Sequence, residues 1–403
     1  MKHIVLVFLV FITGITFSQT ALDFLNSGNN KYKSGDFQGS IMDYTKAIEK
    51  DPKFSIAFYN RGNLYAELNE YKKSLNDLKK AIKLNPYDPD YYFSLGDLYF
   101  SLEDFKNSII NFNKAIELKP NYSEYYDHRG NVWFEIKEYV EAISNYDKAI
   151  ELDDSNYFAI NSRGLAKYEL LDYIGAIADF DKAIQLNSKN PTAYNNRGIS
   201  NLKLQKLNEA LEDYSNAIEV DSSYLEAFFN RGSLLNELKN YNLALEDLNK
   251  AIKLDPEKYE LYISRGITKT ELSDTIGAIQ DYTTSIGLKP NAGAYHNRAN
   301  LKRQTNNPIG SLNDYDKAIE LEPYFSMAYF ERGVLCYDLM MYKNALYNFS
   351  KVIEMNQTDF LAYYYRGMIK YDLKDLRGAC LDWNRSHDLG SEDALEFINL
   401  YCK

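Results

Sequence analysis

Arginine and aspartate recur together along the chain at one fixed separation. Seven of the arginines that recur about every 34 residues, or a multiple of that distance, are each followed sixteen residues later by an Asp. A guanidinium binds a carboxylate through two parallel N–H···O bonds, so this spacing predicts ion pairs. The alternative is pairs of solvated charges that contribute less than about 1 kcal/mol each. Because a catalytic constellation would not recur in seven copies, we interpret the pairs as structural, with these as representatives: Arg61 with Asp77, Arg197 with Asp213, and Arg231 with Asp247.

Other side chains that commonly carry catalysis or bind metals are few and scattered. The chain has four His and three Cys, and no Cys-x-x-Cys motif. That usage argues against zinc-ribbon and thioredoxin-like sites. His128, His296 and His387 are far apart in the sequence and are expected on the surface or in a groove. With no Ser-His-Asp, Cys-His or calcium-loop pattern, we expect no enzyme activity, no metal and no cofactor.

Length, composition and charge narrow the class of protein. At 403 residues the chain exceeds one ordinary globular core, so it forms several domains or an elongated repeat array. A hydrophobic fraction of 45% with 26% charged residues indicates a folded chain. The net charge of −11 repels the negatively charged phosphate backbone of nucleic acids, so we expect no nucleic-acid partner.

A period of 34 residues runs through nearly the whole sequence. Asn60–Pro86 and Asn230–Pro256 match closely at a distance of five periods, and half of the twenty glycines fall in one position of the repeat. After a one-residue deletion the same position continues as Ala299, Gly333 and Gly367. Glycines this far apart are not a phosphate-binding loop. The ten glycines at this position are Gly28, Gly62, Gly96, Gly130, Gly164, Gly198, Gly232, Gly266, Gly333 and Gly367.

Each repeat is predicted to form two helices. In the repeat over 89–122, Ile109, Phe112, Ala115 and Ile116 recur with the spacing of one helix face, and Pro120 ends that helix. Glycine inside a helix costs about 1 kcal/mol relative to alanine. The recurrent glycine therefore predicts a close approach of the two paired helix backbones.

The period, the two-helix unit and the order aromatic, Gly, Ala, aromatic, Pro resemble the tetratricopeptide repeat (TPR) family. The resemblance covers eleven consecutive units, and we assign residues 19–390 to the array. It implies an all-α fold, a right-handed superhelical solenoid of helix-turn-helix units. The chain departs from the family pattern where Arg replaces the usual Leu before the glycine in nine units.

By the same resemblance, positions of the first helices face a concave groove that holds a partner. The positions chosen as candidates are aromatic, amide or acidic, which suits protein recognition by an acidic groove. The Lys–Asn–Arg clamp for a terminal carboxylate found in some family members is absent. The candidates are Tyr59, Asn63, Phe93, Asp97, Glu124, Asp127, Asn131, Asn161, Asn195 and Phe229.

The C-terminal segment, 391–403, is predicted to form a capping helix. Ser391 is suited to the N-cap, and an apolar stripe follows it. Cys380 and Cys402 lie ten residues before and twelve after Gly390, so two antiparallel helices hinged there bring them level. We predict a Cys380–Cys402 disulfide, with two reduced buried thiols as the alternative.

The first eighteen residues read as a secretory signal peptide. Lys2 precedes an unbroken apolar run from Ile4 to Ile12, and small residues follow near Ser18. The run is too short for a membrane span, and an uncleaved anchor is the alternative. We expect an exported chain, periplasmic or extracellular, with no membrane insertion after cleavage.

These observations favour a non-enzymatic interaction scaffold of the cell envelope. Its expected partner is a protein or peptide with a basic or apolar segment. A glycan- or cell-wall-binding module is the second hypothesis, and a structural spacer or self-associating array the third. The oligomeric state is left open, with a monomer as the expectation.

Overall fold

The computed structural model describes residues 19–402, in which every regular element is a helix. The predicted signal peptide, 1–18, lies outside the described residues. The helices alternate as first and second members of eleven pairs, followed by α23 (Glu392–Tyr401). The first helices are α1 (Ala21–Lys33), α3 (Ser55–Glu67), α5 (Pro89–Ser101), α7 (Ser123–Glu135), α9 (Tyr157–Glu169), α11 (Pro191–Lys203), α13 (Leu225–Glu237), α15 (Tyr259–Glu271), α17 (Ala292–Gln304), α19 (Ser326–Asp338) and α21 (Phe360–Asp372).

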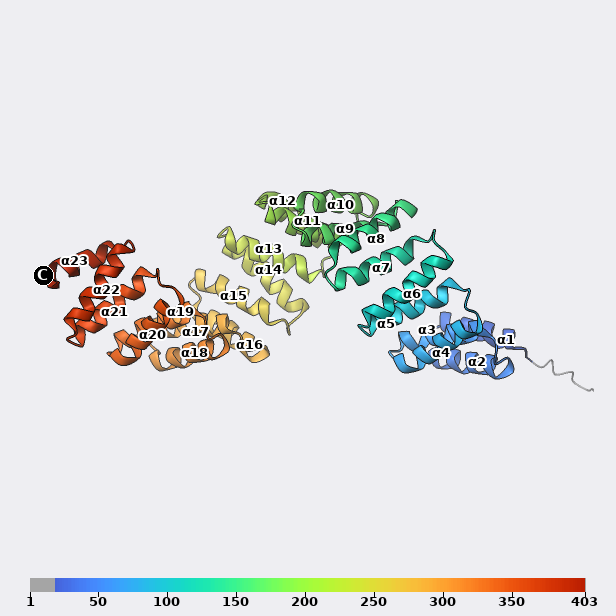
Figure 1. The fold of residues 1–403 in the computed structure, drawn as a ribbon, viewed down its shortest axis with the longest axis horizontal. Coiled ribbons are helices and arrows are strands. Elements are labelled where there is room, and N and C mark those ends of the chain that lie inside the picture. The colour runs from blue at the N-terminus through green and yellow to red at the C-terminus, as the bar shows by residue number, and fades with distance from the viewer. Residues whose placement is uncertain (1–18, 403) are drawn as a thin grey trace, which may run out of the picture. The chain divides into compact units, whose positions relative to one another are not determined.

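The second helices complete the pairs, and each runs antiparallel to the first helix that precedes it (Figure 1). The all-helical TPR-like fold predicted from the sequence is confirmed. The second helices are α2 (Phe37–Lys50), α4 (Tyr71–Leu84), α6 (Phe105–Leu118), α8 (Tyr139–Leu152), α10 (Tyr173–Leu186), α12 (Leu207–Val220), α14 (Tyr241–Leu254), α16 (Thr275–Leu288), α18 (Pro308–Leu321), α20 (Tyr342–Met355) and α22 (Leu376–Asp388).

The chain divides into two compact units. Unit 1 ends at Leu204 and contains α1 to α11, and unit 2 begins at Gln205 and contains α12 to α23. Within each unit, every helix packs against the helix before and after it, and first helices of successive repeats also touch each other.

The turn between the paired helices has one recurring conformation. Gly35 in the first repeat has φ 81°, and a non-glycine residue takes the left-handed conformation at this place in the other ten. Even Leu171 and Met340 adopt it, with φ 65° and 57°. Side chains rarely tolerate this region, so packing of the helix pair imposes it. The sequence pattern predicts a turn here but gives no indication of its left-handed residue, because that residue is not glycine in ten of the eleven turns.

The recurrent glycine makes room for a large side chain of the second helix. In α5, a Cβ on Gly96 would lie 2.8 Å from Cε1 of Phe112 in α6. Gly333 in α19 faces Phe349 in the same way. The sequence predicted a direct approach of two backbones, and that expectation is wrong for these pairs: a ring fills the space. Phe112 and Phe349 are fully buried as a result.

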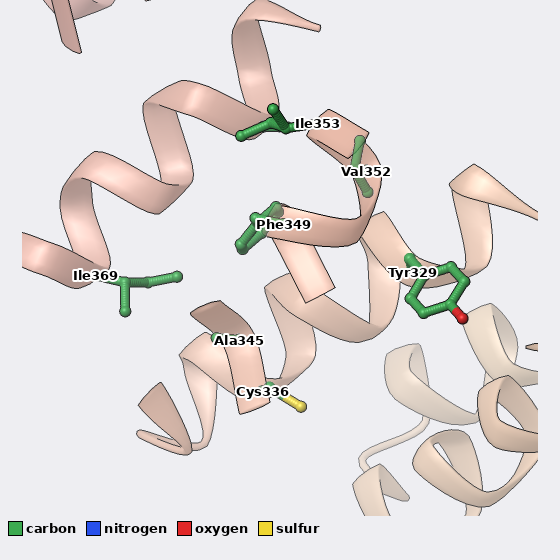
Figure 2. Close-up of a cluster of buried hydrophobic side chains, with 8 residues drawn as sticks. Tyr329, Cys336, Ala345, Phe349, Val352, Ile353 and Ile369 are labelled. Atoms are coloured by element: carbon green, nitrogen blue, oxygen red, sulfur yellow. The ribbon is translucent and has the colours of Figure 1, made fainter. Parts of the chain in front are cut away.

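The cores consist of clusters that join neighbouring repeats. Figure 2 shows one, in which Phe349 lies among side chains from α19, α20 and α21. Cys336 and Ile369 contribute from the two flanking first helices. Because such clusters share residues of adjacent repeats, no repeat buries its apolar face alone.

The last helix closes the final repeat. Ser391 accepts a hydrogen bond from the amide of Ala394 as the N-cap, and Phe397 packs on Trp383 with ring centroids 5.1 Å apart. A disulfide joins Cys380 of α22 to Cys402 at the end of α23, with Cα atoms 5.6 Å apart. The helix thus covers the apolar end of α22.

Gly96→Ala is expected to destabilise the protein by about 1–3 kcal/mol, because the new methyl group overlaps the Phe112 ring. Gly287→Ala in α16 is the matched control, since no neighbouring atom lies within 4 Å of its Cβ position. The control should stabilise by up to about 1 kcal/mol through helix propensity. Urea unfolding measures both changes, and equal effects of the two would contradict the packing role of Gly96.

Candidate functional site

The predicted arginine–aspartate pairs form part of the interior. In unit 2, Arg231 donates through Nε and Nη2 to the two carboxylate oxygens of Asp247, both at 2.7 Å. Arg61 binds Asp77 in the same two-pronged way in unit 1. Arg197 and Asp213 belong to different units, and their pairing stays a prediction. The same arrangement occurs in Arg163–Asp179, Arg265–Asp281, Arg298–Asp314 and Arg366–Asp382.

Each arginine also reaches the preceding repeat, which the sequence pattern did not reveal. Arg231 donates through Nη1 to Ser215 at 3.0 Å, and Arg163 donates to Asp147 at 2.6 Å. The acceptor lies sixteen residues before the arginine, or fifteen for Arg298, and varies in type, so no single motif marks it. A lysine four residues after the arginine adds a further contact in some repeats, as where Lys167 lies 2.7 Å from Asp179. These contacts give the arginines a structural role. The other outward residues of the first helices form the surface that varies between repeats.

We call the surface formed by the first helices of one unit its first-helix face. Three hollows of about 280–320 Å³ lie on these faces, two in unit 1 and one in unit 2. Each is lined by an asparagine whose Oδ1 accepts a hydrogen bond from a buried tyrosine of the paired second helix. Because the tyrosine engages the oxygen, the amide nitrogen remains to donate to a ligand. The pairs are Asn29–Tyr44, Asn131–Tyr146 and Asn300–Tyr315.

Of the amide candidates, two line hollows of unit 1. Asn63 lines the hollow beside Asn29, and Asn131 lines the hollow between α7 and α9. Asn161 is half-buried, and no donor reaches its Oδ1 within residues 19–402. Asn195 is 3% exposed. The structure therefore brings only part of the amide set to an accessible surface.

The acidic candidates of unit 1 have different environments. Glu124 is exposed, and Asp97 accepts a hydrogen bond from Nδ1 of His128 at 2.7 Å. Asp127 is buried, and burial raises the pKa of its carboxyl group to about 6. In the part of the chain that the structure describes, no donor reaches its Oδ1. Asp127 therefore does not lie open to a partner in the way that Glu124 does.

The aromatic candidates pack against neighbouring rings or charges. Tyr59 lies 4.7 Å from Tyr91 between ring centroids, and Phe93 lies 5.0 Å from Tyr125. Phe229 is half-buried beneath the ammonium of Lys258. These rings form the contacts between successive first helices, so they shape the face from below.

Metal-binding clusters and membrane-spanning helices are both absent from the described residues, 19–402. No group of three or more His, Cys, Asp or Glu side chains is placed there to bind a metal ion. None of the helices in that range combines the length and the apolar character needed to cross a bilayer.

Family comparison identifies the repeats. A family described as TPR repeat matches residues 28–68, 62–102 and 164–205, and families described as tetratricopeptide repeat match 191–224, 225–258 and 89–122. The matched segments are tetratricopeptide repeats. Proteins built from tetratricopeptide repeats generally serve as scaffolds for protein interaction. No curated protein matches the sequence.

Several solved structures are similar to this chain. MamA is 27% identical over 42% of this chain and 92% of its own, with a TM-score of 0.39. YrrB, described as a TPR protein with an unusual peptide-binding site, is 26% identical over 44% and 92%, with a TM-score of 0.37. A tetratricopeptide repeat protein from Parabacteroides merdae is 23% identical over 62% and 100%, with a TM-score of 0.46.

Asp127→Asn is expected to stabilise the protein above pH 6 by about 2 kcal/mol. The folded state raises the pKa of Asp127 to about 6, so it binds the proton more tightly than the unfolded chain does. Parent stability therefore falls as pH rises from about 4 to about 6, and the variant lacks this loss. Asparagine fits, because Asn161 and Asn195 occupy the same position in α9 and α11.

Urea unfolding from pH 4 to pH 8 measures this difference. Glu135→Gln, an exposed carboxylate on the same helix, is the control and should change stability by less than about 0.5 kcal/mol. A difference between parent and Asp127→Asn that does not depend on pH would show that burial of this carboxylate is not the cause.

Proposed function

We propose that the protein is a non-enzymatic scaffold that holds a basic or apolar segment of a partner protein on its first-helix face. The observation that carries the proposal is the set of asparagines held by buried tyrosines at three hollows. Their amide nitrogens can donate to carbonyl groups of a bound chain. Because the oxygen of each asparagine is already engaged, the amide is oriented before a partner arrives, which lowers the entropic cost of binding.

Charge favours a cationic partner. The hollow between α7 and α9 contains the exposed Glu135, and the hollow of unit 2 contains Glu331 and Asp359. The net charge of −11 supports the same choice over the whole chain. A negative field speeds the encounter with basic segments and opposes acidic ones.

The packing of the aromatic rings supports a protein partner over a glycan. A sugar-binding platform needs exposed rings on which the sugar stacks. The rings of Tyr59 and Phe93 instead contact other rings between successive first helices. The protein scaffold is therefore the better supported of the two functions.

We further propose that the scaffold acts in the cell envelope. The apolar run of residues 4–12 after Lys2 has the order of a secretory signal. The Cys380–Cys402 disulfide supports the same location, since disulfides persist in oxidising compartments.

A peptide-binding measurement tests the proposed function. A library of unrelated twelve-residue peptides is selected on the immobilised full chain, and the affinity of the retained peptides is measured at low and moderate salt. We expect retained peptides to be enriched in Lys and Arg. The double variant Glu124→Lys/Glu135→Lys should weaken them at least about tenfold, because two exposed carboxylates of α7 are reversed.

The charge-matched control is Glu141→Lys/Glu151→Lys, which reverses two exposed carboxylates of the second helix α8. It should leave the affinity within about twofold of the parent. Retention of no peptide, enrichment of acidic peptides, or equal weakening by the two double variants would contradict binding on the first-helix face.

A further inference from the structure

A hollow of about 310 Å³ in unit 2 combines features that the two hollows described in unit 1 lack. It lies between α17, α19 and the start of α21. Polar groups from three elements meet apolar walls in it. The lining residues are His296, Asn300, Ser326, Met327, Phe330, Glu331, Asp359 and Leu361.

His296 contributes a buried acceptor without a donor. The side chain is 4% exposed, and within residues 19–402 no hydrogen-bond partner reaches its Nε2. Nδ1 lies 3.4 Å from Oδ1 of Asn297, and in the tautomer whose Nδ1–H donates to that oxygen, Nε2 carries a lone pair. Burial lowers the pKa of His296, so the ring is neutral at pH 7 and above. A bare buried acceptor is costly for the fold.

The position of His296 in the repeat shows that the fold does not require histidine there. Three residues before the recurrent small residue, α5, α13 and α19 carry Phe93, Phe229 and Phe330. A phenylalanine at this position would remove the unpaired nitrogen. The histidine thus has a cost for stability that a ligand can offset.

Two carboxylates accompany His296 in the hollow. Glu331 of α19 accepts a hydrogen bond through Oε2 from Arg303 at 3.1 Å, and Arg303 also donates to Asp338. Asp359 caps α21 by accepting the amide of Ala362 through Oδ1. Each carboxylate has a second oxygen with capacity for a donor.

The walls of the hollow are apolar. Met327 is 61% exposed and Leu361 is 41% exposed, and Phe330 is half-buried beside them. An aliphatic chain can lie along such a wall while its charged end reaches the acceptors. The apolar walls and the acceptors together are complementary to an amphipathic ligand with a cationic end.

We propose that this hollow binds the side chain of a lysine from the partner. A primary ammonium has three N–H donors, which matches acceptors on His296, Glu331 and Asp359, and four methylenes cover the apolar wall. The inference rests on the proposed function, because it names one residue of the bound segment.

Nuclear magnetic resonance of the histidine side chains tests the site directly. The full chain is labelled with 15N-histidine, and n-butylammonium chloride is titrated at pH 7.5 with n-butanol and sodium butyrate as comparison probes. Butylguanidinium chloride, which carries the cationic group of an arginine side chain, is titrated in the same way, and its dissociation constant is compared with that of n-butylammonium. Only four histidines are present, and the resonance of His296 is assigned by its loss in His296→Phe. We expect n-butylammonium to shift the Nε2 resonance of His296 saturably, and the two comparison probes to leave it unchanged.

Glu331→Gln and Asp359→Asn should each raise the dissociation constant of n-butylammonium about tenfold. Asparagine retains the cap of α21, so Asp359→Asn leaves the helix intact. Glu354→Gln, which removes an exposed carboxylate of α20 paired with Lys351, is the control and should leave the constant unchanged. His296→Phe should melt at a higher temperature than the parent and lose the stabilisation that n-butylammonium gives the parent.

Several outcomes would overturn the lysine site. These are an unmoved His296 resonance, an equal shift with n-butanol, tighter binding of butylguanidinium than of n-butylammonium, or undiminished binding in Asp359→Asn. Each of these leaves the peptide measurement on α7 of unit 1 unaffected. Failure of this site and failure of the proposed function are therefore distinguishable.

Discussion

Eight of the arginines that precede the recurrent small residue each join three helices of two repeats. Arg231 binds both oxygens of Asp247 within its own repeat and Ser215 in the repeat before. A guanidinium has a rigid planar arrangement of donors, so these contacts fix both the angle within a repeat and the placement of the next one. All nine arginines at this position of the described chain make the contact to the preceding repeat.

This constraint separates the two tasks of the chain. The second helices supply the acceptors and the rings that fill the space beside the glycines, as Phe112 does beside Gly96. The first helices are then held at set positions while their outward residues vary. Two results are the amide of Asn131, held by Tyr146, and the bare Nε2 of His296. The first accepts a hydrogen bond from the hydroxyl of a buried tyrosine, and the second is a buried acceptor that no partner reaches within residues 19–402.

The sequence predicted the fold well because every signal was repeated. The period, the glycine and the Arg–Asp spacing each occur many times, so errors in one repeat are corrected by the others. The contact from Arg231 to Ser215 was not predictable, since its acceptor changes from repeat to repeat. The site was predicted less well because its features are not repeated. The burial of Asp127 and the unpaired nitrogen of His296 each depend on one residue that differs from its counterparts in other repeats, and on the neighbours of that residue in three dimensions.

The most direct test of this account compares two arginine deletions by urea unfolding. In the Arg231→Ala variant, Asp247 loses its cationic partner. The residue four positions after Arg231 is Leu235, which cannot replace it, whereas the residue four positions after Arg163 is Lys167, which contacts Asp179. A buried carboxylate without a partner costs about 3–5 kcal/mol. We predict a loss of about 3 kcal/mol for Arg231→Ala and about half as much for Arg163→Ala. Losses below about 1 kcal/mol for both would show that the arginines are solvated surface charges and would contradict the account.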